Sequence, residues 1–286
     1  MRGRYLTMNR EHRPLQPPIL EKGLSQPHYL YREYEPGKSL EPYVACYWTS
    51  EFVPGEQTQL HRIVPDGCID IIVDLRAANM AKAAFISELM TSFEVIHLME
   101  PQSLFGIRFF SSTVRQFLRY PVSAFRGSHP LLEDLWGSES GLLVEEMREA
   151  QDVKGRIAIV ERKLCNCLEQ QVSLSESLLQ TSMAYLYDTH GSLSVAELSE
   201  KLCFSERHLR RMFHYELGVS PKELAQIIRF QSMLQALYRT PKEQLTQLAH
   251  RYGYFDQPHL IKEFKRYYGI PPSHVFMAGE PKEVRS

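Results

Sequence analysis

The sequence predicts an α+β protein: a β-rich N-terminal domain, a helical connector and an all-α C-terminal domain. Between residues 29 and 110, short β-branched and aromatic runs are separated by Pro, Gly and Asp. After residue 110, apolar residues recur at spacings of three and four, which is typical of helices. Beyond residue 173, this helical pattern occurs twice. The expected divisions are a flexible arm (1–24), a β-rich effector or dimerisation domain (25–150), a helical connector (151–174), an all-α domain (175–279) and a tail (280–286).

The composition excludes several classes of protein. The chain has 286 residues, 33 Lys and Arg against 34 Asp and Glu, and 43% hydrophobic residues, which is typical of a globular protein. No run approaches the roughly 18 consecutive apolar residues of a membrane-spanning helix, so we expect a cytoplasmic protein that does not contact a membrane. Five cysteines without a C-x-x-C pair argue against a disulfide framework and against a zinc site.

The β-rich domain is expected to hold six strands. Pro and Gly at 36–37, 54–55 and 65–67 mark the turns between them. Short strands without βαβ alternation predict an antiparallel barrel or sandwich. The expected strands are 29–34, 43–53, 60–64, 69–75, 93–99 and 104–110.

Helices are expected next at 112–119, 142–150 and 156–172. The last of these carries an apolar stripe formed by Ile157, Val160, Leu164, Leu168 and Val172. Such a stripe can bury against the β-rich domain or pair with a second copy of itself in a homodimer. The spacing favours neither alternative.

The C-terminal domain contains an internal repeat. The first group of matches, Leu198, Cys203 and Phe204, recurs as Leu248, Gly253 and Tyr254. The second group, His208, Leu209, Phe213, Gly218, Val219 and Pro221, recurs as His259, Leu260, Phe264, Gly269, Ile270 and Pro272. The offset grows by one residue between the groups, in a segment where a loop can absorb an insertion. Each unit therefore predicts a helix, a tight turn and a second helix.

Capping residues delimit these helices. Ser194 with Glu197 three residues later forms a capping box, and Ser205 and Asp256 are N-caps of the second helix in each unit. Gly218 is expected to end the first of these second helices.

Each second helix has one apolar face and one polar face. The apolar faces are Leu209, Met212, Phe213 and Leu217 in the first unit, and Leu260, Phe264 and Tyr268 in the second. A helix-turn-helix places its second helix in the DNA major groove, where Arg can read guanine and Gln can read adenine. The candidate DNA-binding residues are Arg207, His208, Arg210, Arg211, Gln257, His259, Ile261, Lys262 and Lys265.

One such unit also arises in ordinary helical domains, where the charges are merely solvated. Two units joined by a helix over residues 221–237, about 24 Å long, favour DNA, because the two second helices can then enter successive major-groove segments.

These residues resemble the AraC/XylS-type transcriptional regulators over residues 178–276. The resemblance rests on Leu-Ser-Val-Ala-Glu-Leu at 193–198, Ser-Glu-Arg-His-Leu-Arg-Arg-Met-Phe at 205–213, Gly-Val-Ser-Pro at 218–221, Arg229-Phe230, Gly-Tyr-Phe-Asp-Gln-Pro-His-Leu-Ile-Lys-Glu-Phe-Lys-Arg at 253–266 and Gly-Ile-Pro-Pro at 269–272. It implies a seven-helix DNA-binding unit with recognition helices at 205–217 and 256–268. Cys203 stands where glycine is frequent, and Pro258 replaces a small polar residue.

The family's usual effector domain is a cupin-like barrel, and the resemblance implies that architecture for the β-rich domain. An enzymatic cupin needs a His-x-His pair, and the segment 51–110 has only His61 and His97, so we expect no catalytic residues, no metal and no cofactor. The candidate ligand-binding residues are Arg62, Arg108, Tyr47, Trp48 and Cys68. In the alternative interpretation, Asp66, Asp70 and Asp74 pair with the arginines and the aromatic side chains are core.

The expected function is that of an effector-responsive transcription regulator and not of an enzyme. Its expected partners are promoter DNA, RNA polymerase and an unidentified small-molecule effector. The rival hypothesis is an interaction protein that docks a protein partner through Arg207, Arg210 and Arg211. The charge is unevenly distributed: residues 1–172 hold 19 basic and 22 acidic side chains, and residues 173–286 hold 14 and 12. The helical half is therefore weakly basic and the β-rich half acidic.

Overall fold

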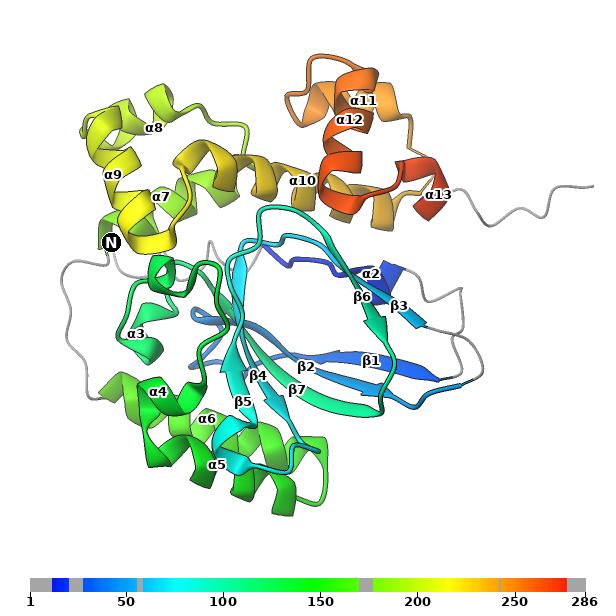
Figure 1. Ribbon diagram of the computed structural model, residues 1–286. Helices are drawn as coiled ribbons and strands as arrows, with labels where there is room; N and C mark the ends of the chain where they lie inside the picture. Colours follow the sequence, from blue (N-terminus) through cyan, green and yellow to red (C-terminus); the bar gives the residue numbers. More distant parts are fainter. Residues whose placement is uncertain (1–11, 21–27, 56–58, 170–176, 242, 277–286) are drawn as a thin grey trace, which may run out of the picture.

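The chain folds into a β-rich, cupin-like domain followed by a helical region, which confirms the α+β prediction (Figure 1). The computed structural model describes residues 12–20, 28–55, 59–169, 177–241 and 243–276. Helices α4, α5 and α6 lie on the side of the sheet away from the helical region (Figure 1).

The β-rich domain consists of two antiparallel sheets. The larger has the strand order β1-β2-β7-β4-β5, and the smaller is the hairpin β3-β6. The expected strands are present to within two residues, and the three-residue β5 was not expected because so short a run carries no periodicity. The strands are β1 (Tyr29–Tyr34), β2 (Val44–Phe52), β3 (Gln59–Ile63), β4 (Cys68–Asp74), β5 (Ala84–Ile86), β6 (Glu94–Leu98) and β7 (Gln102–Phe110).

Strand alternation gives the larger sheet two different faces. Tyr47, Phe105 and Ile107 are fully buried on the face that packs against helices. Their neighbours Trp48 and Arg108 point to the opposite face, toward the hairpin. One face of the sheet thus supplies the core, and the other forms a cavity.

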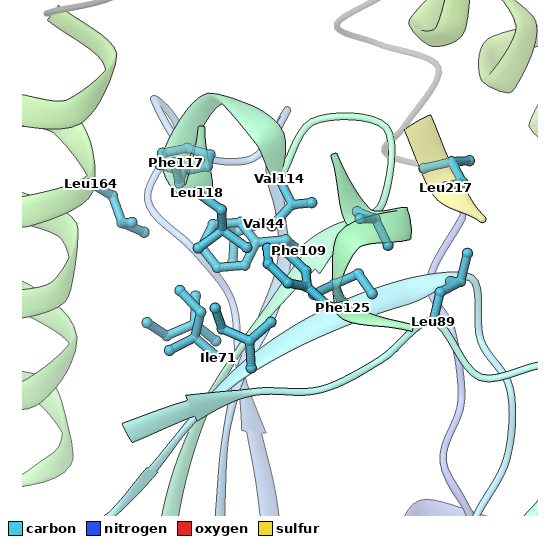
Figure 2. Packing of buried hydrophobic residues seen from close by; sticks show 14 of the residues in the cluster. Val44, Ile71, Leu89, Phe109, Val114, Phe117, Leu118, Phe125, Leu164 and Leu217 are labelled. Carbon is cyan, nitrogen blue, oxygen red and sulfur yellow. The ribbon is translucent and has the colours of Figure 1, made fainter. Parts of the chain in front are cut away.

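The helical face of the sheet is covered by short elements and two longer helices. The long helix α6 places Val160 and Leu164, each at most 1% exposed, against the rest of the domain. Figure 2 shows Leu164 facing Phe117 and Leu118. The centre of this stripe is thus buried against the β-rich domain, as in the first of its two alternatives, and Ile157 and Leu168 are partly buried. Val172 lies outside the described residues. These elements are η1 (Met80–Lys82), α3 (Arg115–Leu118), η2 (Val122–Phe125), α4 (Leu132–Trp136), α5 (Ser138–Glu149) and α6 (Val153–Glu169).

The helical region consists of two helix pairs joined by one long helix, α10, and preceded by α7. Leu217 of α9 joins the buried cluster of the β-rich domain, where Figure 2 shows it beside Leu89. A second cluster surrounds α10 and α12 and includes Val64 from the loop after β3. Both helix pairs therefore pack against the β-rich domain. The helices are α7 (Ser177–Asp188), α8 (Val195–Leu202), α9 (Glu206–Leu217), α10 (Pro221–Arg239), α11 (Leu245–Arg251), α12 (Gln257–Tyr268) and α13 (Pro272–Phe276).

Residues 12–20 form an N-terminal strap that was expected to belong to a flexible arm. That expectation fails for this segment, because His12 and Gln16 are each 5% exposed and the segment ends in a short helix, α2 (Pro17–Leu20). The strap is held by hydrogen bonds to both the β-rich domain and α10. The strap is ordered because its polar side chains bond to residues far along the chain, and the sequence does not reveal these partners.

Among the described residues, none of the helices is sufficiently long and apolar to span a membrane.

Candidate nucleic-acid interface and ligand cavity

The two second helices, α9 and α12, begin in the same way. The Ser205 hydroxyl accepts a hydrogen bond from the His208 amide at 3.2 Å, and the Asp256 carboxylate accepts one from the His259 amide at 2.8 Å. Gly218 and Gly269 end these helices in left-handed conformations. The two helices therefore share the same pattern of capping at both ends, and each has a histidine at its third position.

Burial of one side fixes which side of each helix is presented. In α9, Leu209 and Phe213 are fully buried, and in α12 Leu260 and Phe264 are fully buried. The opposite faces carry the predicted DNA-binding residues.

On α9, Arg207, Arg210 and Arg211 are exposed. Arg210 forms an ion pair at 2.6 Å with Glu206, one helical turn earlier. Arg207 and Arg211 form no ion pair with a described residue, so both guanidinium groups are free to meet an anion or a base edge. His208 is half-buried and stacks on Phe204, with ring centroids 5.0 Å apart.

On α12, His259, Lys262 and Lys265 are exposed. The Gln257 side chain is half-buried and accepts a hydrogen bond from the Thr246 hydroxyl at 3.0 Å, a bond that pairing with adenine would replace. Ile261, which we expected to face outward, is partly buried against the second cluster. The methyl groups of Ile261 are therefore only partly exposed on the outer face of α12.

Two residues near these helices were not predicted as functional. Phe255 is the extra residue between the two repeats and is 86% exposed, directly before the N-cap of α12. Arg229 on α10 donates to the Gly191 carbonyl at 3.0 Å and to the Gly253 carbonyl at 3.3 Å, and so ties together the loop before α8 and the turn between α11 and α12. The inserted aromatic residue was the signal in the sequence for Phe255, and no signal there indicated the partners of Arg229.

The β-rich domain grips the C-terminal end of α12. Arg62 donates to the Tyr268 carbonyl at 2.7 Å, and its guanidinium lies between the Phe93 and Tyr268 rings. Glycine is required beneath this contact, because a Cβ at Gly269 would lie 2.7 Å from the Phe93 ring. Arg62 is thus an interdomain contact and does not line the cavity, which corrects its prediction as a ligand-binding residue.

A second grip holds the C-terminal end of α9. Arg126 donates to the Gly218 carbonyl at 3.0 Å, and Ser123 donates to the Tyr215 carbonyl at 2.5 Å. Arg115 forms an ion pair with Glu216 at 2.5 Å. Both recognition helices are therefore held at the ends that lie opposite their capped N-terminal turns.

The strap ties the β-rich domain to the middle of α10. Gln16 donates to the Val64 carbonyl at 2.9 Å and to the Asp66 carboxylate at 2.8 Å. The buried Gln231 side chain of α10 accepts from the Leu15 amide at 2.8 Å and donates to the Pro65 carbonyl at 2.9 Å. A bond network thus runs from the loop after β3, through the strap, to the helix that joins the two helix pairs.

The strap is also anchored by His12. Its ring stacks on Tyr187, with centroids 4.4 Å apart, and one ring nitrogen lies 3.2 Å from the Asp66 carbonyl oxygen. Burial lowers the pKa of His12 to about 4, so the imidazole is neutral at neutral pH.

A cavity of about 430 Å³ lies between the larger sheet and the β3-β6 hairpin, and the strap residues Gln16 and Pro18 form part of its wall. Trp48, Cys68 and Arg108, three of the predicted ligand-binding residues, line it. Tyr47 does not, because it is adjacent to Trp48 in β2 and points to the helical face, where its hydroxyl donates to Glu161 at 3.3 Å. Tyr47 is therefore corrected to a core residue.

The Arg108 side chain is 5% exposed and surrounded by carboxylates. It pairs with Asp70 at 3.1 Å, with Asp66 at 3.2 Å and with Glu33 at 3.5 Å. The Trp48 indole donates to the Asp70 carboxylate at 2.9 Å. Arg108 thus has the acidic partners of the alternative interpretation, except that Asp74 is not among them.

Burial also determines the protonation of two other groups at the cavity. It raises the pKa of the Cys68 thiol well above its usual value, which keeps the sulfur protonated and unreactive. It lowers the pKa of His61 to about 4, so this imidazole contributes no positive charge at neutral pH.

Comparison with known proteins found two family models. A helix-turn-helix domain matches residues 198–278, and a domain of unknown function, DUF6597, matches residues 32–130. The multiple antibiotic resistance protein MarA of Escherichia coli is 36% identical over 95 residues, which are 32% of this chain and 72% of that protein. An uncharacterized HTH-type transcriptional regulator of Haemophilus influenzae is 29% identical over 111 residues, 38% of this chain and 37% of that protein. Among solved structures, ToxT from Vibrio cholerae is similar with a TM-score of 0.41 at 12% identity, over 88% of this chain and 100% of that chain.

Proposed function

The chain belongs to the AraC/XylS-type family of transcriptional regulators, and from this membership we propose that it reads two successive major-groove segments of promoter DNA with α9 and α12. The observation that carries the proposal is the pair of identically capped helices with exposed basic faces, joined by the 19-residue helix α10. A helix of this length spans about 28 Å, comparable to the roughly 34 Å between major-groove segments one turn apart.

The proposed DNA-binding side chains differ in the part of the DNA that their chemistry suits. Arg207 and Arg211, which are unpaired among the described residues, suit guanine edges, and Gln257 suits adenine. Lys262 and Lys265 suit phosphates, which position the helix without reading sequence. His208, Arg210, His259 and Ile261 complete the proposed contact surface.

We also propose that the β-rich domain responds to a small-molecule effector. Support comes from the cavity, whose wall includes the strap that binds α10, and from the grips of Arg62 and Arg126 on the recognition helices. A ligand that moves the strap or the hairpin would alter how α9 and α12 are held. Binding of RNA polymerase, homodimer formation and a cytoplasmic location remain further predictions. A homodimer would need a surface other than the buried part of the α6 stripe. Sedimentation that showed a monomer at high concentration would contradict the homodimer.

Selection from a random DNA pool, followed by titration of the selected site at several salt concentrations, tests the proposal. A DNA-binding regulator enriches a defined sequence, and the logarithm of its binding constant falls linearly with the logarithm of salt, by roughly 0.9 per phosphate contacted. A full chain that enriches no sequence at low salt would contradict the proposed function and leave the rival hypothesis of a protein-docking surface on α9.

A further inference from the structure

The cavity of the β-rich domain has the size and shape of a small-molecule site. Its volume of about 430 Å³ lies within the roughly 300–1,000 Å³ typical of pockets for drug-sized ligands. One wall is aromatic: Tyr29, Tyr31 and Trp48 come from β1 and β2, and the Tyr31 and Trp48 rings lie 6.0 Å apart at 28°. Gly106, paired with Trp48 across the sheet, makes this wall flat, because any Cβ there would overlap the indole.

Acidic side chains outnumber basic ones on the cavity wall. Arg108 is the one Lys or Arg among the described residues that line it. Asp66, Asp70 and Glu33 already surround this guanidinium, so three carboxylates meet one positive charge.

Further carboxylates line the cavity without a cationic partner among the described residues. Asp74 accepts a hydrogen bond from the Arg76 amide at 2.8 Å, and Glu88 accepts one from the Gly127 amide at 2.7 Å. Glu94 lines the same cavity from the hairpin. Among the described residues, the lining thus carries more acidic than basic side chains.

This arrangement disfavours an anionic ligand. A carboxylate that approached Arg108 would have to displace Asp70 or Asp66, and the displaced buried carboxylate would lose its partner at a high free-energy cost. A cation meets the opposite situation, because the carboxylates attract it and the faces of Trp48 and Tyr31 attract it through their ring quadrupoles.

We infer that the cavity binds a cationic ligand, an amine with a flat apolar body, whose ammonium group lies toward Asp70 and Asp66 and whose body lies along Trp48. This inference deepens the proposed effector response, on which it rests for its biological role. Asp66 also accepts a hydrogen bond from the strap residue Gln16, so the ligand would contact the hydrogen-bond network that reaches α10.

Three indole probes of matched size test the charge preference on the full chain. Tryptamine carries an ammonium group, tryptophol a hydroxyl and indole-3-propionate a carboxylate on the same two-carbon arm. Titration calorimetry should show tryptamine binding at least tenfold more tightly than indole-3-propionate, with tryptophol between them. Equal affinities, a preference for the carboxylate, or no binding of any probe would overturn the inference.

Two variants locate the binding. Asp70→Asn removes one charge while keeping a similar shape, and it should reduce tryptamine affinity about tenfold with little change for tryptophol. Glu145→Gln removes the same charge from the exposed face of α5 and should change nothing. Ile72→Trp fills the cavity from β4 and changes no ionisable residue, and it should abolish binding of all three probes even if Asp70→Asn fails to fold. Retained tryptamine binding in Ile72→Trp would show that the site lies elsewhere and would overturn the inference.

The same preparations are titrated with the selected DNA site. Normal DNA binding together with no charge preference in the cavity overturns this inference alone. Tryptamine binding without any DNA binding overturns the proposed function alone.

Discussion

At the scale of single residues, Cys203 holds an unfavourable backbone conformation. It ends α8 with φ of 57°, a left-handed geometry in which a Cβ is strained, whereas the matching position in the second repeat is Gly253 with φ of 67°. The two repeats therefore form the same turn with different residues, and the cysteine adopts this backbone conformation with strain whereas the glycine does not.

We expect Cys203→Gly to stabilise the protein by about 0.5–1 kcal/mol, since the relief of strain exceeds the added flexibility of the unfolded chain. Urea unfolding measures the change. Cys203→Ala keeps the Cβ and serves as the control, with an expected change near zero. Destabilisation by both variants would show that the thiol contact with the Glu200 carbonyl matters more than the strain.

Arg211→Ala should relax DNA specificity at one base position, at a cost of about 1–3 kcal/mol for the preferred base, because its exposed guanidinium forms no ion pair with a described residue and is proposed to read guanine. Lys265→Ala should instead weaken binding to all sequences and reduce the salt slope by about one. Binding to a panel of single-base variants of the selected site separates these effects. Arg162→Ala on α6 removes an equivalent charge outside the interface and should leave the panel unchanged; a uniform loss with Arg211→Ala would refute base reading.

At the scale of elements, we expect the strap to make the stability of the fold depend on pH. The folded pKa of His12 is about 4 and its unfolded value is near 6.5, so the unfolded chain takes up the proton first as the pH falls. The contribution of neutral His12 is therefore complete above about pH 6.5 and is lost progressively between about pH 6.5 and 4, by about 3 kcal/mol at most.

His12→Phe keeps the stacking on Tyr187 and cannot be protonated. Its unfolding free energy should fall less than that of the wild type between about pH 7 and about pH 4.5, as measured by urea unfolding at both values. His97→Phe, at an exposed position on β6, should follow the wild-type dependence. Parallel curves for wild type and His12→Phe would mean that His12 does not link the strap to pH.

Gln231→Leu tests the junction between the strap and α10. It leaves the Leu15 amide and the Pro65 carbonyl without their side-chain partner, which should cost about 1–3 kcal/mol of stability and increase amide hydrogen exchange in residues 12–20. Gln226→Leu, at a half-buried position of the same helix, is the control and should leave exchange in the strap unchanged. Unaltered exchange with Gln231→Leu would show that other contacts hold the strap.

The elements that the sequence predicted well are those governed by local chemistry. Ser194, Ser205 and Asp256 cap their helices as expected, because a capping side chain bonds to an amide three residues away. The cavity was less predictable. Tyr47 and Trp48 were both proposed as ligand residues, although adjacent residues of a strand face opposite sides and at most one could line the site.

Distant contacts account for the rest. Arg62 bonds to Tyr268, 206 residues later, and nothing near either residue in the sequence indicates the pair. The strap was misjudged for the same reason, since its partners Val64 and Gln231 are far along the chain.

At the scale of the whole molecule, the acidic β-rich domain and the weakly basic helical region meet through contacts at the C-terminal ends of α9 and α12. Arg126 and Arg62 bond there to backbone carbonyls, on the side away from the capped turns that are proposed to enter the groove. These contacts need not break when DNA binds.

Because Arg62 and Arg126 hold the C-terminal ends of α12 and α9, we expect the β-rich domain to set the distance between the two proposed recognition helices. The wild-type chain should therefore tolerate only one number of base pairs between its two subsites, as measured by selection from a pool in which that number varies. Arg62→Ala should widen the range of accepted spacings, whereas Arg162→Ala should not. An unchanged range of accepted spacings would show that α10 alone sets the spacing between the two subsites. If the range widens, we expect the proposed effector to change which promoters fit the protein more than how tightly it binds any one promoter.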